Sequence, residues 1–209
     1  MSDTLTAAAR LVPEPGRRRI LGLAGPPAAG KSTLAERLVA GLNERFGADT
    51  AARVPLDGFH LSNAQLERLG YTGRKGAIFT FDVYGYLALL RRLLAEPGRE
   101  VYVPDYDRVL HEPVAARHVV TARTRLIVTE GNYLARPENG WEEVSGLVAE
   151  LWYVDAPRTV RWKRLVERHS AGGRGESAAR ERAYRNDLPN GELVRADRRR
   201  CTRVVTSEP

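Results

Sequence analysis

The sequence RILGLAGPPAAGKS, residues 19–32, joins a short apolar run to a loop rich in glycine and proline. The apolar run Arg19–Ala24 predicts a buried strand. The loop Gly25–Ser32 matches the pattern G-x-x-x-x-G-K-[ST] without a mismatch. The next segment, Lys31–Phe46, predicts an amphipathic helix because apolar residues recur one turn apart, at Leu34, Leu38 and Leu42. A strand, a glycine-rich loop and a helix in this order indicate a phosphate-binding loop.

Each part of this loop has a chemical role toward a nucleotide phosphate. Backbone N–H groups of the loop and the positive end of the following helix surround phosphate oxygens. Lys31 is expected to reach the β and γ phosphates as a point charge, and Ser32 to offer its hydroxyl to Mg²⁺. The expected cofactors are therefore ATP and Mg²⁺. The predicted nucleotide-binding residues are Gly25, Pro26, Pro27, Ala28, Ala29, Gly30, Lys31, Ser32 and Thr33.

Strands and helices alternate along the rest of the chain. Further strands are predicted at 52–56, 101–103, 125–129, 151–154 and 203–205, and helices at 84–94, 158–169, about 176–185 and 187–197. This alternation predicts an α/β fold of three α/β/α layers, with a mostly parallel five-stranded sheet. Residues 1–17 are polar, contain proline and show no period, so a flexible N-terminal tail is expected before one domain over 18–209.

Acidic residues follow four consecutive predicted strands. Asp57 follows the second strand, Asp105 and Asp107 the third, Glu130 the fourth and Asp155 the fifth. Ligands of parallel sheets bind outside the carboxyl ends of the strands, so these carboxylates are expected to meet the phosphate-binding loop. Asp105 and Asp107 suit a polar pocket for substrate hydroxyls, and equally an Asx turn beside an arginine.

Phosphoryl transfer offers roles for two of these acids. Glu130 ends a hydrophobic strand before a glycine, which suits a carboxylate that holds Mg²⁺ with Ser32, or one that caps a turn. Asp57 would face the γ phosphate if its strand neighbours Arg19–Ala24, and it would then accept the proton of an acceptor hydroxyl. An Asp-Gly pair is also typical of a turn, so the residues alone leave both interpretations of Asp57 open.

A cationic stripe precedes a glycine-rich joint at residues 171–175. Arg161, Arg164 and Arg168 share one face of the predicted helix 158–169. This arrangement predicts a helical lid over about 168–187 that excludes water from the nucleotide. Arg164 and Arg168 are the expected catalytic arginines because they lie nearer the joint, while a solvated helix face is the alternative.

The net charge of +7 is concentrated near the C-terminus. Residues 158–203 contain 14 Lys and Arg against six Asp and Glu, so the excess lies in the predicted lid and its surroundings, and most of these arginines are expected to be solvated. No apolar run approaches the ~20 residues of a membrane span, the start lacks a secretory pattern, and the single Cys201 excludes an internal disulfide. We expect a cytoplasmic protein with neither nucleic-acid nor membrane partner; a homodimer is left open.

Together the motifs resemble the phosphoribulokinase/uridine kinase family of P-loop kinases, and especially its pantothenate-kinase-like branch. Similar bacterial proteins are named nucleoside/nucleotide kinase or fructose-transport-associated kinase. The resemblance extends from about Arg19 to Val205. It rests on Asp57-Gly-Phe-His60, Arg74-Lys75-Gly76, Thr80-Phe81-Asp82, Pro104-Asp105-Tyr106-Asp107 and Glu130-Gly131-Asn132-Tyr133.

The resemblance implies a P-loop NTPase fold and an ATP-dependent kinase that phosphorylates a hydroxyl of a small metabolite. It implies that Asp57 is the catalytic base, beside Lys31, and that Glu130 is the second acid of the metal site. Arg164 and Arg168 would belong to the lid. The implied substrate-binding residues are Asp57, His60, Lys75, Asp105, Tyr106, Asp107 and Asn132.

The acceptor and two other functional classes stay open at this point. The chain is shorter than pantothenate kinases and lacks an evident pyrimidine-binding pattern of uridine kinases, so the acceptor is a pantothenate-like acid, a nucleoside or a sugar. A GTPase-type regulator is disfavoured because no N-K-x-D motif is found. A nucleic-acid-stimulated NTPase is disfavoured because aromatic residues do not interleave with the basic ones after Tyr184.

Overall fold

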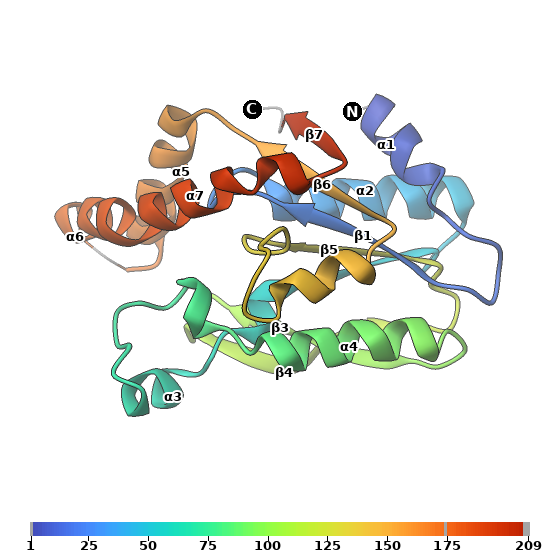
Figure 1. Cartoon of the computed structure of the whole chain (residues 1–209), viewed down its shortest axis with the longest axis horizontal. Helices are drawn as coiled ribbons and strands as arrows, with labels where there is room; N and C mark the ends of the chain where they lie inside the picture. Colours follow the sequence, from blue (N-terminus) through green and yellow to red (C-terminus); the bar gives the residue numbers. More distant parts are fainter. Residues whose placement is uncertain (1, 174, 207–209) are drawn as a thin grey trace.

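The computed structural model describes residues 2–173 and 175–206 (Figure 1). Its centre is a five-stranded parallel sheet in the order β2-β5-β1-β6-β7. The strands are β1 (Arg19–Ala24), β2 (Ala51–Pro55), β5 (Leu126–Gly131), β6 (Glu150–Asp155) and β7 (Arg203–Thr206). The predicted α/β class and the five-stranded parallel sheet are confirmed.

Helices cover both faces of the sheet and make the three predicted layers. On one face, α2 (Lys31–Phe46) packs its leucines against β1, β5 and β6. On the other face, α4 (Val83–Ala95) joins a second apolar cluster that includes Trp141 and the opposite side chains of the same strands. β1 and β5 are therefore almost wholly buried, which explains why their apolar runs show no alternation.

The N-terminal residues do not form the flexible tail that their polarity predicted. Ser2–Ala9 is a helix, α1, that packs against α2 (Figure 1). Ala7, Ala8 and Leu11 are buried in the cluster on that face. Leu5 approaches Gly41 so closely that a Cβ at position 41 would lie 2.9 Å from it. Alanine favours helix strongly, and this short apolar face is stabilised by tertiary packing that composition does not reveal.

The strand predicted at 101–103 is not part of the main sheet. It runs further, as β3 (Val101–Asp107), and pairs antiparallel with β4 (Glu112–Val120), a strand that sequence patterns did not predict. The register shifts between Val103 and Asp105, so the chain accommodates Pro104 by an irregularity instead of ending the strand. The fifth strand of the parallel sheet is β7.

A C-terminal helical segment follows β6. It consists of α5 (Arg158–Ala171), α6 (Glu176–Arg182), one turn of π-helix (Ala183–Asp187) and α7 (Leu188–Ala196). Leu165 of α5 packs on Ala183 and Leu188, so these helices share a small core. The predicted joint at 171–175 contains residue 174, which lies outside the described residues.

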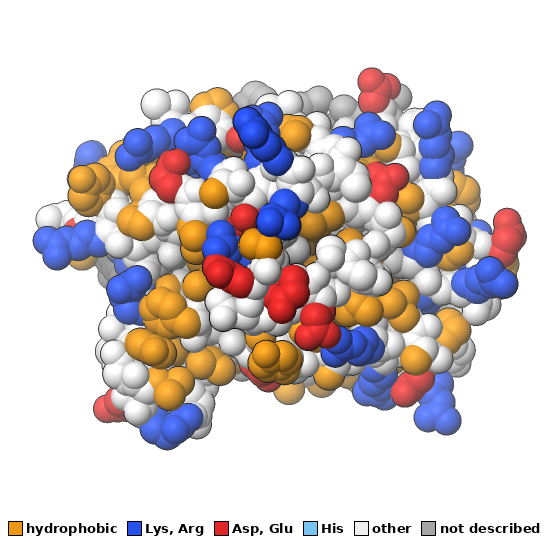
Figure 2. Space-filling view, in the orientation of Figure 1, with side chains coloured by type: hydrophobic (Ala, Val, Ile, Leu, Met, Phe, Trp, Pro, Cys, Tyr) orange, Lys and Arg blue, Asp and Glu red, His pale blue; other side chains and the backbone are white. Residues whose placement is uncertain are grey.

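Short helices complete the described chain. They are α3 (Asn63–Arg68) and the 3-10 turns η1 (Leu56–Phe59), η2 (Ile78–Thr80), η3 (Trp141–Gly146) and η5 (Arg198–Arg200). In the described ranges, none of the helices has the length and apolar character needed to cross a membrane. Basic side chains spread over the face in Figure 2 with acids among them, including over the C-terminal helices. Several C-terminal arginines pair with glutamates one turn away, as expected of a solvated surface.

Candidate active site

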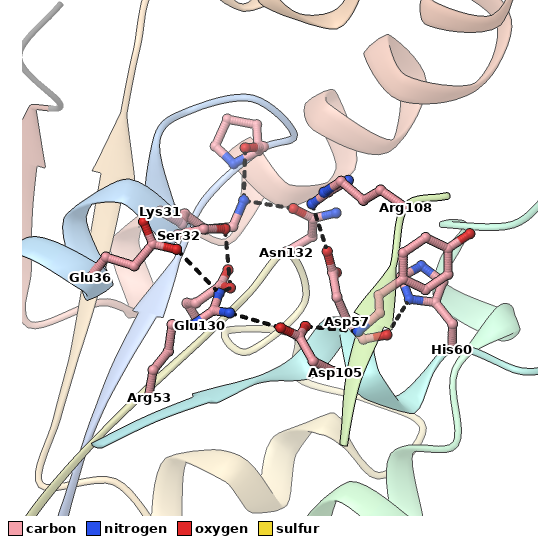
Figure 3. Close-up of polar contacts among 12 residues, drawn as sticks. Lys31, Ser32, Glu36, Arg53, Asp57, His60, Asp105, Arg108, Glu130 and Asn132 are labelled. Atoms are coloured by element: carbon pink, nitrogen blue, oxygen red, sulfur yellow. Dashed lines mark hydrogen bonds and ion pairs between the residues drawn. The ribbon is translucent and has the colours of Figure 1, made fainter. Parts of the chain in front are cut away.

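A cavity of about 930 Å³ opens at the carboxyl ends of the parallel strands. Its walls come from the loop after β1, the η1 turn after β2, the residues that end β5, the tip of the β3–β4 hairpin and the C-terminal helical segment. Figure 3 shows polar side chains that line this cavity, such as Lys31, Ser32, Asp57 and Glu130, together with neighbours that contact them. Elements distant in sequence thus converge on one site, as expected for a parallel sheet.

The loop Gly25–Ser32 adopts the tight turn that its glycines predict. Gly25 has φ 152°, and a Cβ at this residue would lie 2.4 Å from the carbonyl oxygen of Val154, so the position requires glycine. Gly30 is left-handed and caps α2. Of the predicted nucleotide-binding residues, six line the cavity: Pro27, Ala28, Gly30, Lys31, Ser32 and Thr33. The other three, Gly25, Pro26 and Ala29, are buried and do not line it.

Lys31 lies in the cavity with its charge held by two neutral acceptors. Its Nζ donates hydrogen bonds to the Pro26 carbonyl oxygen at 3.0 Å and to Asn132 Oδ1 at 2.8 Å (Figure 3). Burial lowers the pKa of Lys31 to about 8, although the nearby Glu130 and Asp57 act to raise it. The ammonium group is therefore mostly charged at neutral pH but poorly solvated, a state that favours exchange of these acceptors for phosphate oxygens.

Ser32 and Glu130 form a pair of oxygen donors beside Lys31. The Ser32 hydroxyl donates to Glu130 Oε1 at 3.1 Å, and Arg53 Nη1 lies 3.5 Å from the same oxygen. Burial, reinforced by the charge of Asp57, raises the pKa of Glu130 to about 7. Carboxylate and hydroxyl oxygens are ligands that Mg²⁺ prefers, and a cation there would compensate a buried negative charge. The residues present therefore fit a Mg²⁺ site.

Glu130→Gln is predicted to remove a pH dependence from the stability of the metal-free protein. The folded chain holds the Glu130 proton up to pH about 7, against 4.5 for an unperturbed glutamate. The folded state then binds more protons than the unfolded state in this window, so stability falls as pH rises through it. The urea midpoint of Glu130→Gln, relative to wild type, should thus increase between pH 5 and 7.5. If the difference in urea midpoint between variant and wild type is the same at pH 5 and pH 7.5, the pKa of Glu130 is not raised in the folded protein.

Asp57 reaches the cavity although its strand does not neighbour β1. β5 lies between β2 and β1 in the sheet. Pro55 pairs with Glu130, so the η1 turn begins level with the end of β5 and carries Asp57 to the cavity edge. The condition on which the sequence placed Asp57 near the γ phosphate, a strand next to β1, is not met. Asp57 nevertheless lines the same cavity as Lys31, and each affects the pKa of the other.

Cationic side chains keep Asp57 ionised. Burial opposes ionisation, yet the positive charge of His60 when its ring is protonated, and the charges of Arg108, Arg168 and Lys31, hold the pKa of Asp57 below its usual value. Arg108 Nη2 lies 3.5 Å from Asp57 Oδ2, a long and half-exposed contact. The carboxylate is therefore charged at neutral pH and able to accept a further hydrogen bond.

His60 forms the wall next to Asp57. Its Nδ1 donates to the Asp57 carbonyl oxygen at 2.8 Å, which makes Nε2 the acceptor of the neutral ring. Burial lowers the pKa of His60, so the ring is neutral at physiological pH. The ring packs between Phe81 and Tyr106, with centroids 4.1 and 4.9 Å away. Gly58 permits this approach of the hairpin, because a Cβ there would lie 2.5 Å from the Pro104 carbonyl oxygen.

Three other predicted substrate-binding residues also line the cavity. Lys75 Nζ donates to Asn63 Oδ1 at 2.8 Å and forms an ion pair with Glu112 at 3.1 Å. The same ammonium lies 5.3 Å from the centre of the Tyr106 ring. Asn132 binds Lys31, so it contacts the phosphate-binding lysine as well as the cavity.

Asp105 and Asp107 are not among the described residues that line the cavity. Asp105 Oδ2 accepts from Arg53 and His118, each at 2.8 Å, behind the hairpin. Asp107 Oδ1 accepts hydrogen bonds from the backbone N–H groups of Val109 and Leu110. Its other carboxylate oxygen forms an ion pair with Arg117. Asp107 thus forms the Asx turn with an arginine nearby that the sequence left open. Asp105 is paired with Arg53 and His118 instead, and its only backbone contact described is with the adjacent N–H of Tyr106. The structure does not place them as substrate ligands.

The three arginines of α5 differ in their surroundings. Arg161 is buried, 1% exposed, and its Nε donates to the Ala156 carbonyl oxygen. Arg164 donates to the Ala28 carbonyl oxygen at 3.4 Å and lines the cavity, and Arg168 lines it with an exposed side chain. The sequence singled out Arg164 and Arg168, and not Arg161, as the arginines that act on the nucleotide. Their positions in the cavity wall agree with that choice.

Several cavity residues were missed by sequence reasoning. Arg108 lies at the hairpin tip beside Asp57, and His169 on α5 contacts Asp187 at 2.6 Å. Arg182 of α6 also lines the cavity. Arg108 directly follows the Asp107 of a recognised motif, which was the available signal. The others belong to an arginine-rich segment in which sequence does not separate inward from solvated side chains.

The strand-loop-helix phosphate site, with a carboxylate facing its lysine on a parallel sheet, defines a P-loop kinase. The family model described as "Phosphoribulokinase / Uridine kinase family" matches residues 20–181, and the chain belongs to this family. As a member it is a P-loop kinase, and the family implies ATP as its nucleotide.

Relatives in this family carry different names. A protein of Schizosaccharomyces pombe provisionally named a uridine kinase is 34% identical, over 85% of this chain and 78% of its own. A pantothenate kinase of Leifsonia xyli subsp. xyli is 38% identical, over 66% of this chain and 43% of its own. A Silicibacter sp. TM1040 protein, provisionally named a fructose transport system kinase, has a crystal structure with TM-score 0.86. Its identity is 33%, over 96% of this chain and 98% of its own.

Proposed function

We propose that this protein is an ATP-dependent kinase that transfers the γ-phosphoryl group to a hydroxyl of a small metabolite. The observation that carries the proposal is one cavity that holds both the buried Lys31 of the phosphate-binding loop and the ionised Asp57. A protein that only binds nucleotide has no need of an ionised carboxylate facing the γ-phosphate end. A kinase uses such a carboxylate to orient the acceptor.

The proposed step moves one proton and one phosphoryl group. The acceptor hydroxyl donates a hydrogen bond to the Asp57 carboxylate, and its oxygen attacks the γ phosphorus. The bond from that phosphorus to the β–γ bridging oxygen breaks, and ADP leaves with this electron pair. Asp57 takes the acceptor proton as the new oxygen–phosphorus bond forms. Since its pKa is below the usual value, this transfer comes late, which suits a loose transition state.

Charge neutralisation comes from the loop and from α5. Lys31 would bind β- and γ-phosphate oxygens, while Ser32 and Glu130 would hold Mg²⁺. The bound cation would neutralise part of the charge on the transferred group. Arg164 and Arg168 line the same cavity and would bind phosphate oxygens when the lid, about residues 168–187, covers the nucleotide.

The acceptor would bind between η1 and the hairpin. His60 Nε2 offers an acceptor, while Lys75, Tyr106 and Asn132 line the cavity around it. These groups suit a polar molecule with several hydrogen-bonding atoms, so a pantothenate-like acid, a nucleoside and a sugar all remain candidates. The names of the relatives include a pantothenate kinase and proteins provisionally assigned to uridine and to fructose transport.

The test is ATP consumption by the purified protein with Mg²⁺, across vitamins, nucleosides and sugars. We expect at least one of these acceptors to raise ADP formation far above the acceptor-free rate, with a phosphorylated product detected by mass spectrometry. Hydrolysis that ignores every acceptor but rises with RNA or DNA would contradict the kinase proposal.

A further inference from the structure

The backbone loop 73–76 contacts the C-terminal helical segment on one side and the acceptor end of the cavity on the other. Arg182 of α6 donates hydrogen bonds to two carbonyl oxygens of this loop, that of Gly73 and that of Lys75, the second at 2.6 Å. Asn186 and Asn190 add donors to the carbonyl oxygens of Lys75 and Gly76, at 3.4 and 3.3 Å. The loop is therefore held by side chains from α6, the π-helical turn and α7.

The side chain of Lys75 leaves the same loop in the direction of the hairpin. Its Nζ donates to the His111 carbonyl oxygen at 2.7 Å, as well as to Asn63 and Glu112. Two ends of one residue thus connect different parts of the protein. The carbonyl oxygen binds Arg182 of the helical segment. The ammonium group binds Asn63, His111 and Glu112, which together we call the acceptor-binding wall.

From this geometry we propose that Arg182 is a positioning residue, which couples closure of the C-terminal helical segment over the nucleotide to the ordering of the acceptor-binding wall. The coupling rests on the proposed kinase function, because it requires a nucleotide under the segment. When the segment closes, the guanidinium of Arg182 fixes the carbonyl oxygens of the loop and thereby sets Lys75. When the segment opens, these carbonyl oxygens lose donors and the loop is released.

The coupling is reciprocal in free energy. A nucleotide that closes the C-terminal helical segment also orders the acceptor-binding wall. An acceptor that orders this wall in turn favours closure of the segment. The acceptor site is then complete only when the nucleotide is covered, which limits transfer of the phosphoryl group to water.

Hydrogen exchange of backbone amides tests the coupling without a known acceptor. The amides of Arg74, Gly76 and Ala77 are hydrogen-bonded within the loop region and report its ordering. In wild type, a non-hydrolysable ATP analogue with Mg²⁺ should slow exchange in 25–34 and in 71–80, the latter at least about fivefold, at the lower end of ordinary coupling. In Arg182→Ala, slowing should persist in 25–34 and be lost in 71–80.

Arg180→Ala is the matched control. Arg180 lies on the same helix, is exposed, and forms an ion pair with Glu176, so this variant should behave as wild type. Arg182→Lys keeps a cationic donor and should restore part of the slowing in 71–80. Unchanged exchange of β1 and β5 without nucleotide establishes that each variant is folded.

The outcomes separate the two proposals. Nucleotide-dependent slowing in 71–80 that survives Arg182→Ala overturns the coupling, and so does slowing in wild type that is confined to 25–34. If the analogue slows neither region of the wild-type protein, the nucleotide-binding function itself fails.

Discussion

Lys31→Ala is expected to lower the turnover number by at least about a hundredfold, in line with the loss of one preorganised charge from a transition state. The ammonium group lies in a low-dielectric pocket, where burial already lowers its pKa to about 8. Its interaction with developing phosphate charge is therefore little screened by water. The measurement is steady-state ADP formation with Mg²⁺ and the acceptor found in the screen.

The substitution should also weaken nucleotide binding, because Lys31 is expected to bind the phosphates in the ground state as well. Lys163→Ala is the matched control, since Lys163 is an exposed lysine of α5 that does not line the cavity. This control should keep its turnover within about threefold, as usual for a solvated surface change. A Lys31→Ala enzyme that turns over as fast as Lys163→Ala would contradict the assigned role of Lys31.

The phosphate-binding loop could be predicted because its chemistry is local. Gly25, Gly30 and Lys31 have their roles within eight consecutive residues, and the strand and helix beside them have strong apolar patterns. Glu130 could be placed for a similar reason, since it comes near the carboxyl end of β5, directly after the hydrophobic part of that strand. The sheet order could not be read in this way. It needed the knowledge that β5, distant in sequence, inserts between β1 and β2.

The parts that sequence missed depend on tertiary contacts. β4 is mostly half-exposed or exposed and lacks the apolar run of a core strand, and it is defined by pairing with β3. Asp105 satisfied the pattern of a strand-end acid, but Arg53 and His118 hold it away from the cavity. Arg182 differs from Arg180 only by its position on α6, and only the folded helix shows which one reaches the loop 73–76.

Asp57→Asn is expected to reduce the turnover number by about 10²- to 10⁴-fold, the range for loss of a general base. The amide keeps the size of the side chain and can orient a hydroxyl, but it cannot take the acceptor proton. Nucleotide affinity should persist or increase, because removal of a negative charge leaves Lys31 and Arg168 more attractive to phosphates. Turnover and binding of a non-hydrolysable ATP analogue, measured on the same preparation, separate these effects.

Asp107→Asn makes the same chemical change outside the cavity and is the matched control. Asn can still accept the two backbone N–H bonds that Asp107 accepts, so the turn should persist and turnover should stay near wild type. If Asp57→Asn retains a normal turnover number, Asp57 is not the base and its charge serves another purpose. If it loses nucleotide binding together with turnover, Asp57 supports the loop instead of the acceptor. Only loss of transfer with intact nucleotide binding agrees with a carboxylate that acts on the acceptor hydroxyl.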